Sequence, residues 1–232
     1  MSIELSVVVP CYNEERTLRR ILEAIRASGV DSLEVIVVDD ASRDGSVALL
    51  EGELAPLVDK LVKHPVNRGK GAALRSGFAH ARGQYVVVQD ADLEYDPREF
   101  GKLLAPIREG KADVVFGSRF ISGGTRRVPD FWHYLANFGL TLATNVFSNL
   151  NVSDMETCYK VFRRDIIQGM RLVEDRFGFE PEVTLKLSRI PDIRIYEVGI
   201  SYYGRTYAEG KKIGWKDGVR AIWCIVRYGL AD

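Results

Sequence analysis

Three acidic side chains follow a short apolar segment near the middle of the chain. Asp90, Asp92 and Glu94 come directly after residues 85–89, a β-branched run typical of a buried strand. Residues two apart on extended backbone project to the same side, with Cα atoms roughly 7 Å apart, so both aspartates can converge on one ligand. Carboxylate oxygens suit Mg²⁺ or Mn²⁺, which complete their shells with substrate phosphates. We therefore predict a divalent metal that holds a diphosphate; the alternative is a solvated acidic turn.

Composition limits the classes of partner. The 232 residues include 32 Lys or Arg and 32 Asp or Glu, so net charge predicts no nucleic-acid partner. The three cysteines, Cys11, Cys158 and Cys224, are odd in number and far apart. This pattern argues against a disulfide framework or a cysteine metal site and fits a reducing compartment. We expect a cytoplasmic protein.

Strand-like and helix-like segments alternate along the first half of the chain. Strands are predicted at residues 5–9, 34–38, 60–63, 85–89 and 112–116, and helices at 14–27, 43–54, 70–81 and 97–109. Such alternation predicts an α/β fold with a mostly parallel central sheet and helices on both faces. After Gly117 the pattern changes, with a loop at 121–129, helices at 130–149, 181–188 and 215–228, and strands at 159–162 and 193–198.

Residues 131–153 contain no charged side chain and could in principle span a bilayer. The window also contains His133, four asparagines, and several Thr and Ser residues. Burying these polar groups in hydrocarbon would cost several kcal/mol, on the order of a few for each unsatisfied group. We therefore predict a helix that lies at an interface or is buried in protein.

Polar groups follow three of the predicted strands. Tyr12 follows the first and could stack on a nucleobase, and Asp39 or Asp40 follows the second and could accept from a base N–H or a ribose hydroxyl. Gly69 allows close backbone approach, and Lys70 lies at a helix start, where anions are favoured. The alternatives are a helix cap for the aspartates and a solvated helix terminus for the lysine. The chain has neither a Walker A sequence nor a GxGxxG after its first strand.

The combination of motifs resembles the family 2 inverting glycosyltransferases of GT-A fold. The motifs are VVVPCYNEE at 7–15, VVDDASRDGS at 37–46, NRGKG at 67–71 and QDADL at 89–93. Three more resemble the branch of dolichol-phosphate mannose synthase and related polyprenyl-phosphate hexose synthases: GSRF at 117–120, SDMETCYKVFRR at 153–164 and YGRTYAEGKK at 203–212.

The resemblance implies that a hexose moves from a nucleotide diphosphate sugar, of GDP-mannose or UDP-glucose type, to a polyprenyl or dolichyl phosphate. It implies Mg²⁺ or Mn²⁺ as cofactor and a peripheral location on the cytoplasmic face of the membrane. The chain would be one GT-A domain, 1–232, whose residues 1–117 bind the donor and whose residues 118–232 face the acceptor and the membrane. A homo-oligomer or a membrane subunit could also cover that second surface.

The resemblance also implies roles for single residues. Donor-binding positions would be Pro10, Tyr12, Glu14, Asp39, Asp40, Gly69, Lys70, Asp90, Ala91 and Asp92, and metal ligands would be Asp90, Asp92 and Glu94. The catalytic set would be Asp92, Asp154, Arg119 and Arg205, with both arginines on phosphates. Asp154 would act as a base or, as we favour, orient the acceptor or a cation. Two phosphate-contacting positions of mannose synthases, an Arg and a Ser, fall at His133 and Asn137, a departure that leaves the sugar open.

Two other functions stay open at this point. A glycosyltransferase of the same fold could act on a saccharide or another non-lipid acceptor in cell-wall or polysaccharide synthesis. Alternatively, the chain could be a catalytically silent subunit that only binds nucleotide sugars. The aromatic residues of 131–153 and 215–228, with Arg126, Arg127, Lys211 and Lys212 nearby, suit an anionic lipid surface, although ordinary core packing would also explain them.

Overall fold

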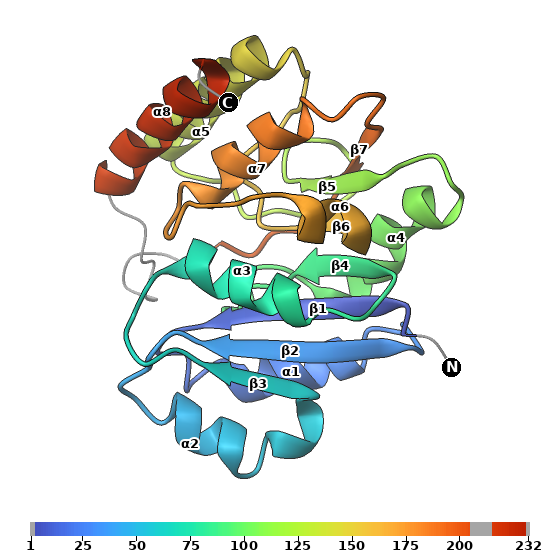
Figure 1. Cartoon of the computed structure of the whole chain (residues 1–232), viewed down its shortest axis with the longest axis vertical. Coiled ribbons are helices and arrows are strands. Elements are labelled where there is room, and N and C mark those ends of the chain that lie inside the picture. The colour runs from blue at the N-terminus through green and yellow to red at the C-terminus, as the bar shows by residue number, and fades with distance from the viewer. Residues whose placement is uncertain (1–2, 205–214, 231–232) are drawn as a thin grey trace.

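A seven-stranded sheet forms the centre of the computed structural model, which describes residues 3–204 and 215–230 (Figure 1). The strand order is β3-β2-β1-β4-β6-β5-β7, and all neighbours are parallel except those of β6. The strands are β1 Leu5–Cys11, β2 Leu33–Asp39, β3 Lys60–Lys63, β4 Tyr85–Val88, β5 Val114–Ser118, β6 Lys160–Arg163 and β7 Ile195–Gly199. The predicted mostly parallel sheet is confirmed.

Helices cover both faces of this sheet (Figure 1). They are α1 Leu18–Arg26, α2 Ser46–Glu51, α3 Lys70–His80, α4 Phe100–Arg108, α5 Phe131–Ser148, α6 Arg164–Gly169, α7 Phe179–Leu187 and α8 Trp215–Leu230, with 3₁₀ turns η1 Ala55–Leu57 and η2 Pro97–Glu99. Side chains alternate along β1, so Val7 and Val9 pack with α1 and α4, whereas Val8 packs with α3 and α7. The apolar run of β1 is buried on both faces because helices cover both.

Several predicted elements differ in detail, and the helix predicted at 43–54 spans only Ser46–Glu51. The first helix begins at Leu18 and not at residue 14, because residues 14–17 form a turn in which the Glu14 carbonyl accepts from the Thr17 N–H at 3.0 Å. The strand predicted at 159–162 is present as β6, but it runs antiparallel to β4 and β5. The short helix α6 was not predicted, because six residues carry too little periodicity.

Helices α5 and α8 pack side by side at one end of the molecule (Figure 1). The outer side of α8 exposes Val219, Ile222, Trp223 and Val226, while Cys224 and Ile225 face the interior. Core packing therefore does not explain these exposed apolar side chains. None of the helices within residues 3–204 and 215–230 combines the length and apolarity of a transmembrane span.

Asp113, just before β5, ties three strands together. Its carboxylate accepts from the backbone N–H of Arg194 at 3.1 Å, from its Nε at 2.9 Å and from Arg163 at 3.4 Å. The hydrogen bonds and charge of Arg194 lower the pKa of Asp113 to about 2, although partial burial opposes this. The ionised carboxylate is thus stabilised by folding.

We predict that Asp113→Asn lowers the free energy of unfolding by about 1 kcal/mol at pH 7, a modest value because both arginine partners are half exposed. A native pKa below the ordinary 3.8 makes this contribution complete above about pH 4, and it is lost as the pH falls through about 2. Urea unfolding at several pH values should show the difference from wild type shrinking in acid. Asp165→Asn, which removes an exposed partner of Arg163, is the control. An equal loss at all pH values would contradict the assignment.

Candidate active site

A cavity of about 370 Å³ lies at the carboxyl ends of β1, β2, β4 and β5. This is the edge where open α/β sheets bind ligands, and the volume suits a small molecule. The predicted residues on its wall are Pro10, Tyr12, Glu14, Asp40, Gly69, Lys70, Asp90, Ala91, Asp92, Glu94 and Arg119. Asp39 and Asp154 lie behind the wall, and Arg205 is outside the described residues.

Left-handed backbone marks the ends of three strands that meet at this cavity. Asn13 follows β1 with φ 53°, Ala41 follows β2 with φ 61°, and Leu93 follows β4 with φ 65°. A non-glycine residue in this region costs roughly 1–3 kcal/mol and persists only where the surroundings hold it. The strand ends are therefore fixed in conformations that aim Tyr12 and the acidic residues at the cavity.

Asp40 positions the loop before α3. Its Oδ1 bonds His64 Nδ1 at 2.7 Å and accepts from the Arg68 N–H at 2.9 Å, and its Oδ2 accepts from the Gly69 N–H at 2.6 Å. Gly69 has φ 99°, and a Cβ there would lie 2.5 Å from the Asp175 carbonyl oxygen. Only glycine fits this close approach of the Asp175 backbone. The predicted approach of Gly69 to a ligand stays a prediction.

Asp39, which precedes Asp40 in the chain, is almost fully buried. The Oδ2 atom accepts from the Ser42 N–H at 3.1 Å, whereas Oδ1 has no hydrogen-bond partner among the described residues. A buried carboxylate oxygen without a partner is costly. Because Asp39 lies behind the cavity wall, its contact with a ligand stays a prediction.

Lys70 lies between acidic side chains on the inner wall. Its ammonium is 2.9 Å from Asp90 Oδ1 and 3.3 Å from Glu180 Oε1, and it also donates to Cys158 Sγ at 2.8 Å. Burial alone would lower the pKa of Lys70, but the negative charge of Asp90 and Glu180 raises it well above its usual value. The lysine is therefore a permanent positive charge beside the acidic motif.

The acidic motif consists of Asp90, Asp92 and Glu94. The Glu94 N–H donates to Asp92 Oδ1 at 3.2 Å, and Glu94 Oε2 accepts from the Tyr202 hydroxyl at 2.8 Å. No group of three His, Cys, Asp or Glu side chains among the described residues is arranged to hold a metal ion. Two wall aspartates nevertheless suit Mg²⁺, which is commonly bound through one or two carboxylates plus substrate phosphates. Glu94 as a third ligand stays a prediction.

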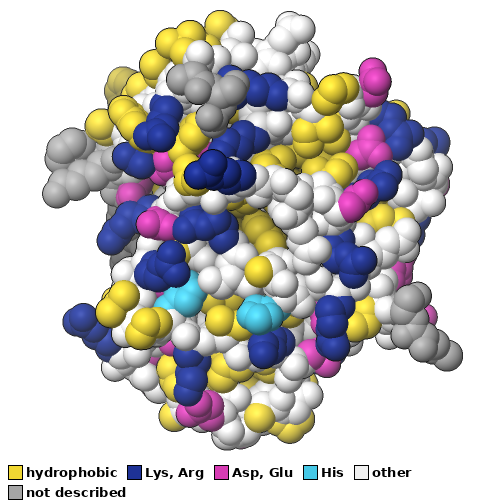
Figure 2. Space-filling view, in the orientation of Figure 1, with side chains coloured by type: hydrophobic (Ala, Val, Ile, Leu, Met, Phe, Trp, Pro, Cys, Tyr) yellow, Lys and Arg dark blue, Asp and Glu magenta, His cyan; other side chains and the backbone are white. Residues whose placement is uncertain are grey.

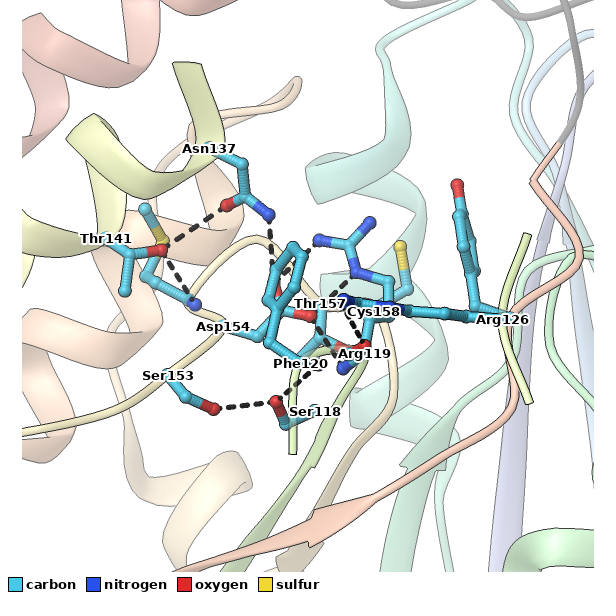
Figure 3. A network of polar contacts seen from close by, with 12 residues as sticks. Ser118, Arg119, Phe120, Arg126, Asn137, Thr141, Ser153, Asp154, Thr157 and Cys158 are labelled. Carbon is cyan, nitrogen blue, oxygen red and sulfur yellow. Dashed lines mark hydrogen bonds and ion pairs between the residues drawn. The ribbon is translucent and has the colours of Figure 1, made fainter. Parts of the chain in front are cut away.

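Arg119 and Asp154 form a bidentate ion pair (Figure 3). Arg119 Nε lies 2.7 Å from Oδ2 and Nη2 lies 2.7 Å from Oδ1, while Asn137 donates to Oδ1 at 3.2 Å. Burial alone would raise the pKa of Asp154, but the Arg119 charge lowers it below its usual range. Asp154 is therefore an ionised residue that positions Arg119 from behind.

The two positions at which the chain departs from mannose synthases lie in different parts of the site. His133 lines the cavity, while Asn137 is buried and bonded to Asp154. Only the first could contact a phosphate in the cavity. Sequence reasoning missed several further wall residues, of which Glu156, Glu180, Arg176 and Tyr202 are charged or polar. Glu156 lies inside the motif at 153–164, a signal that could have found it.

Comparison with known proteins identifies the family. The family model described as Glycosyl transferase family 2 matches residues 6–170. The chain is 31% identical to an undecaprenyl-phosphate mannosyltransferase of Micrococcus luteus, over 97% of this chain and 93% of the relative. It is 32% identical to the low-salt glycan biosynthesis hexosyltransferase Agl6 of Haloferax volcanii, over 98% of this chain. The chain spans only about half of that second relative, 53% of its length.

Solved structures confirm the predicted GT-A fold. Glucosyl-3-phosphoglycerate synthase from Mycobacterium tuberculosis, in complex with Mn²⁺, UDP and phosphoglyceric acid, superposes with a TM-score of 0.73 at 20% identity, covering 99% of this chain and 80% of that one. At this identity the likeness shows the fold alone. Since the family model covers most of the chain and the Micrococcus relative matches along nearly its whole length, the chain belongs to glycosyl transferase family 2.

Proposed function

We propose that this protein is an inverting glycosyltransferase that moves a hexose from a nucleotide diphosphate sugar to a polyprenyl phosphate. The observation that carries the proposal is a cavity in which two acidic strand-end residues, Asp90 and Asp92, face two buried cations, Lys70 and Arg119. Such an arrangement suits a bound diphosphate. The Micrococcus relative is named for undecaprenyl phosphate, which supports the acceptor, and the Mycobacterium structure contains UDP, which supports the donor.

The donor would bind along the ends of β1, β2 and β4, within residues 1–117. Tyr12 offers a ring for the nucleobase, with Pro10 and Glu14 beside it on the wall. The unpartnered Asp39 Oδ1 would accept from a base N–H or a ribose hydroxyl. Gly69 and Lys70, at the start of α3, line the cavity where the diphosphate would lie.

The wall aspartates fit a hard divalent cation, since their oxygens are the ligands that Mg²⁺ and Mn²⁺ prefer. Asp90 and Asp92 would hold the ion, with Glu94 as the proposed third ligand and Ala91 between them on the wall. When bound, the ion neutralises charge on the diphosphate. The Mycobacterium structure contains Mn²⁺ with UDP, which supports this cofactor class.

Chemistry at the anomeric carbon needs little more than positioning and charge. An inverting transfer is one in-line displacement in which the nucleoside diphosphate leaves, so negative charge grows on the leaving group. Lys70 and Arg119 stabilise that charge. Arg205, which is not among the described residues, is proposed to contribute a third positive charge. The acceptor phosphate is largely dianionic at pH 7, with a second pKa of about 6, and therefore needs no strong base. This agrees with the position of Asp154 behind Arg119.

The acceptor side would meet the membrane through α5 and α8. Helix α5 buries its polar residues Asn137, Thr141, Thr144 and Ser148 and exposes its large apolar ones, including Trp132 with 76% of its surface accessible. Figure 2 shows hydrophobic side chains near Lys and Arg side chains at this end of the molecule. Exposed apolar area flanked by arginines suits insertion among anionic headgroups.

Incubation with radiolabelled nucleotide sugars and polyprenyl phosphate should give a lipid-phosphate sugar that is resolved by thin-layer chromatography. We expect Asp92→Asn to lower turnover by roughly 10²-fold or more and to abolish the effect of Mn²⁺ on nucleoside diphosphate binding by calorimetry. Asp31→Asn, an exposed position, is the control. Label appearing only in a saccharide would favour the non-lipid acceptor, and unchanged turnover would refute the metal assignment.

Arg119→Lys should lower kcat/KM by roughly 10²-fold, because lysine keeps the charge but cannot make both contacts to Asp154. Steady-state kinetics with the donor varied would measure this. Arg98→Lys alters an exposed arginine of equal size and should leave kcat/KM unchanged. If Arg119→Lys matched wild type, the bidentate pair would not be needed for transfer.

Replacing Trp132 and Phe138 together with serine should reduce co-sedimentation with anionic vesicles by about tenfold or more, since each large side chain contributes roughly 1.5–3 kcal/mol when buried. The melting temperature should not fall, because both side chains are exposed. Tyr196→Ser, on β7, is the matched control. If vesicle binding persisted but self-association measured by light scattering disappeared, this surface would be an interface between copies of the chain.

A further inference from the structure

A buried glutamate connects the last helix to the loop that precedes α7. Glu174 is 4% exposed and lies between α6 and α7. Its Oε2 accepts from Arg220 Nε at 3.0 Å and from Arg220 Nη2 at 2.9 Å, and its Oε1 accepts from the Tyr228 hydroxyl at 2.8 Å. Both partners lie on α8. Because charge-assisted contacts from an arginine fork fix the geometry of a carboxylate, the position of Glu174 depends on how α8 packs.

The chain around Glu174 is held from two sides. On the α8 side, a Cβ on Gly178 would lie 2.6 Å from Cys224 Sγ and 2.7 Å from Glu174 Oε2, so the two elements are in close contact. On the α7 side, the backbone N–H groups of Val173 and Glu174 donate to the two carboxylate oxygens of Glu182, each at 2.8 Å. Residues 173–174 are therefore fixed between the two helices.

The same loop lies against the start of α3. The Ala72 N–H donates to the Asp175 carbonyl oxygen at 3.0 Å, and the Arg75 guanidinium donates to the Glu174 carbonyl oxygen. A Cβ on Gly71 would collide with that same Glu174 carbonyl oxygen, so only glycine allows this approach. The first turn of α3 is thus built against the backbone of residues 174–175, and a shift of that backbone displaces it.

Both segments contribute to the cavity. Gly69 and Lys70 line it from the start of α3, and Arg176 lines it from the loop. Arg220 and Tyr228, in contrast, are not among the residues that line the cavity. Helix α8 is therefore connected to the proposed diphosphate site through the Glu174 carboxylate and the backbone that follows it.

We propose that Glu174 is a positioning residue that couples the docking of α8 to the geometry of the donor site. The inference rests on the proposed function, because it takes the cavity around Lys70 as the place where the diphosphate binds. Without Arg220, the buried carboxylate would lose its cation, and the loop would shift to relieve that cost. Lys70 and Arg176 would then be displaced relative to the diphosphate, and binding would weaken although neither side chain is altered.

Calorimetry with UDP and with GDP, each in the presence of Mn²⁺, tests the inference. For the nucleoside diphosphate that wild type binds, we expect Glu174→Gln and Arg220→Gln each to weaken binding by roughly fivefold or more, a size typical of coupling between connected sites. The double variant should bind no more weakly than either single variant, because both substitutions break the same contact. Arg220 is half exposed, so its variant decides the question even if Glu174→Gln does not fold.

Asp113→Asn is the matched control for a purely structural effect. It also breaks a carboxylate pair with two arginine contacts, since Arg194 Nε and Nη2 donate to Asp113 at 2.9 and 2.8 Å. Asp113 precedes β5 and so lies at the opposite edge of the sheet from the cavity. The control should lower the melting temperature and leave diphosphate affinity unchanged.

The outcomes separate this inference from the function on which it rests. If folded Glu174→Gln and Arg220→Gln behaved like the control, losing stability but not affinity, Glu174 would be a stabilising residue only and the inference would be overturned. Additive weakening in the double variant would also overturn it, because the two residues would then act through different contacts. Failure of wild type to bind either nucleoside diphosphate would instead refute the proposed function, and the inference with it.

Discussion

The buried ion pair between Arg119 and Asp154 determines the arrangement of the cavity. The two side chains are 10% and 0% exposed, so their removal from water costs several kcal/mol per ion by order of magnitude. Two short charge-assisted contacts and the amide of Asn137 offset that cost. An apolar pair at these two positions would fill the same space at a lower desolvation cost. It would not, however, place a fixed positive charge on the cavity wall, as Arg119 does.

This constraint also explains why α5 is polar inside and apolar outside. The face of α5 toward the protein must supply partners for Asp154 and its loop, and it does so through Asn137 and through Thr141, whose hydroxyl accepts from the Met155 N–H at 3.2 Å. The large apolar side chains are consequently left on the outer face. This inverted pattern of exposed apolar side chains is the observation behind the proposed contact with a lipid surface.

The sequence predicted those parts that depend on local pattern. Strand ends with Tyr12, Asp40 and Asp90 were predicted to meet because carboxyl ends of parallel strands share one edge, and they do. The meeting of Glu156 and Glu180 on one wall could not be predicted, since it depends on a loop before an antiparallel strand and a helix start far apart in sequence. The pairing of Asp154 with Asn137 was likewise invisible, because it depends on how α5 packs.

Lys70 links the proposed metal site to the proposed diphosphate site. The Lys70 ammonium contacts both oxygens of Asp90, at 2.9 and 3.0 Å. A cation that approached this carboxylate alone would be repelled by the lysine, whose charge is permanent. Under the proposed function, the diphosphate would offer Lys70 a second anionic partner and so free Asp90. Metal and donor are therefore expected to bind together, each making the site favourable for the other.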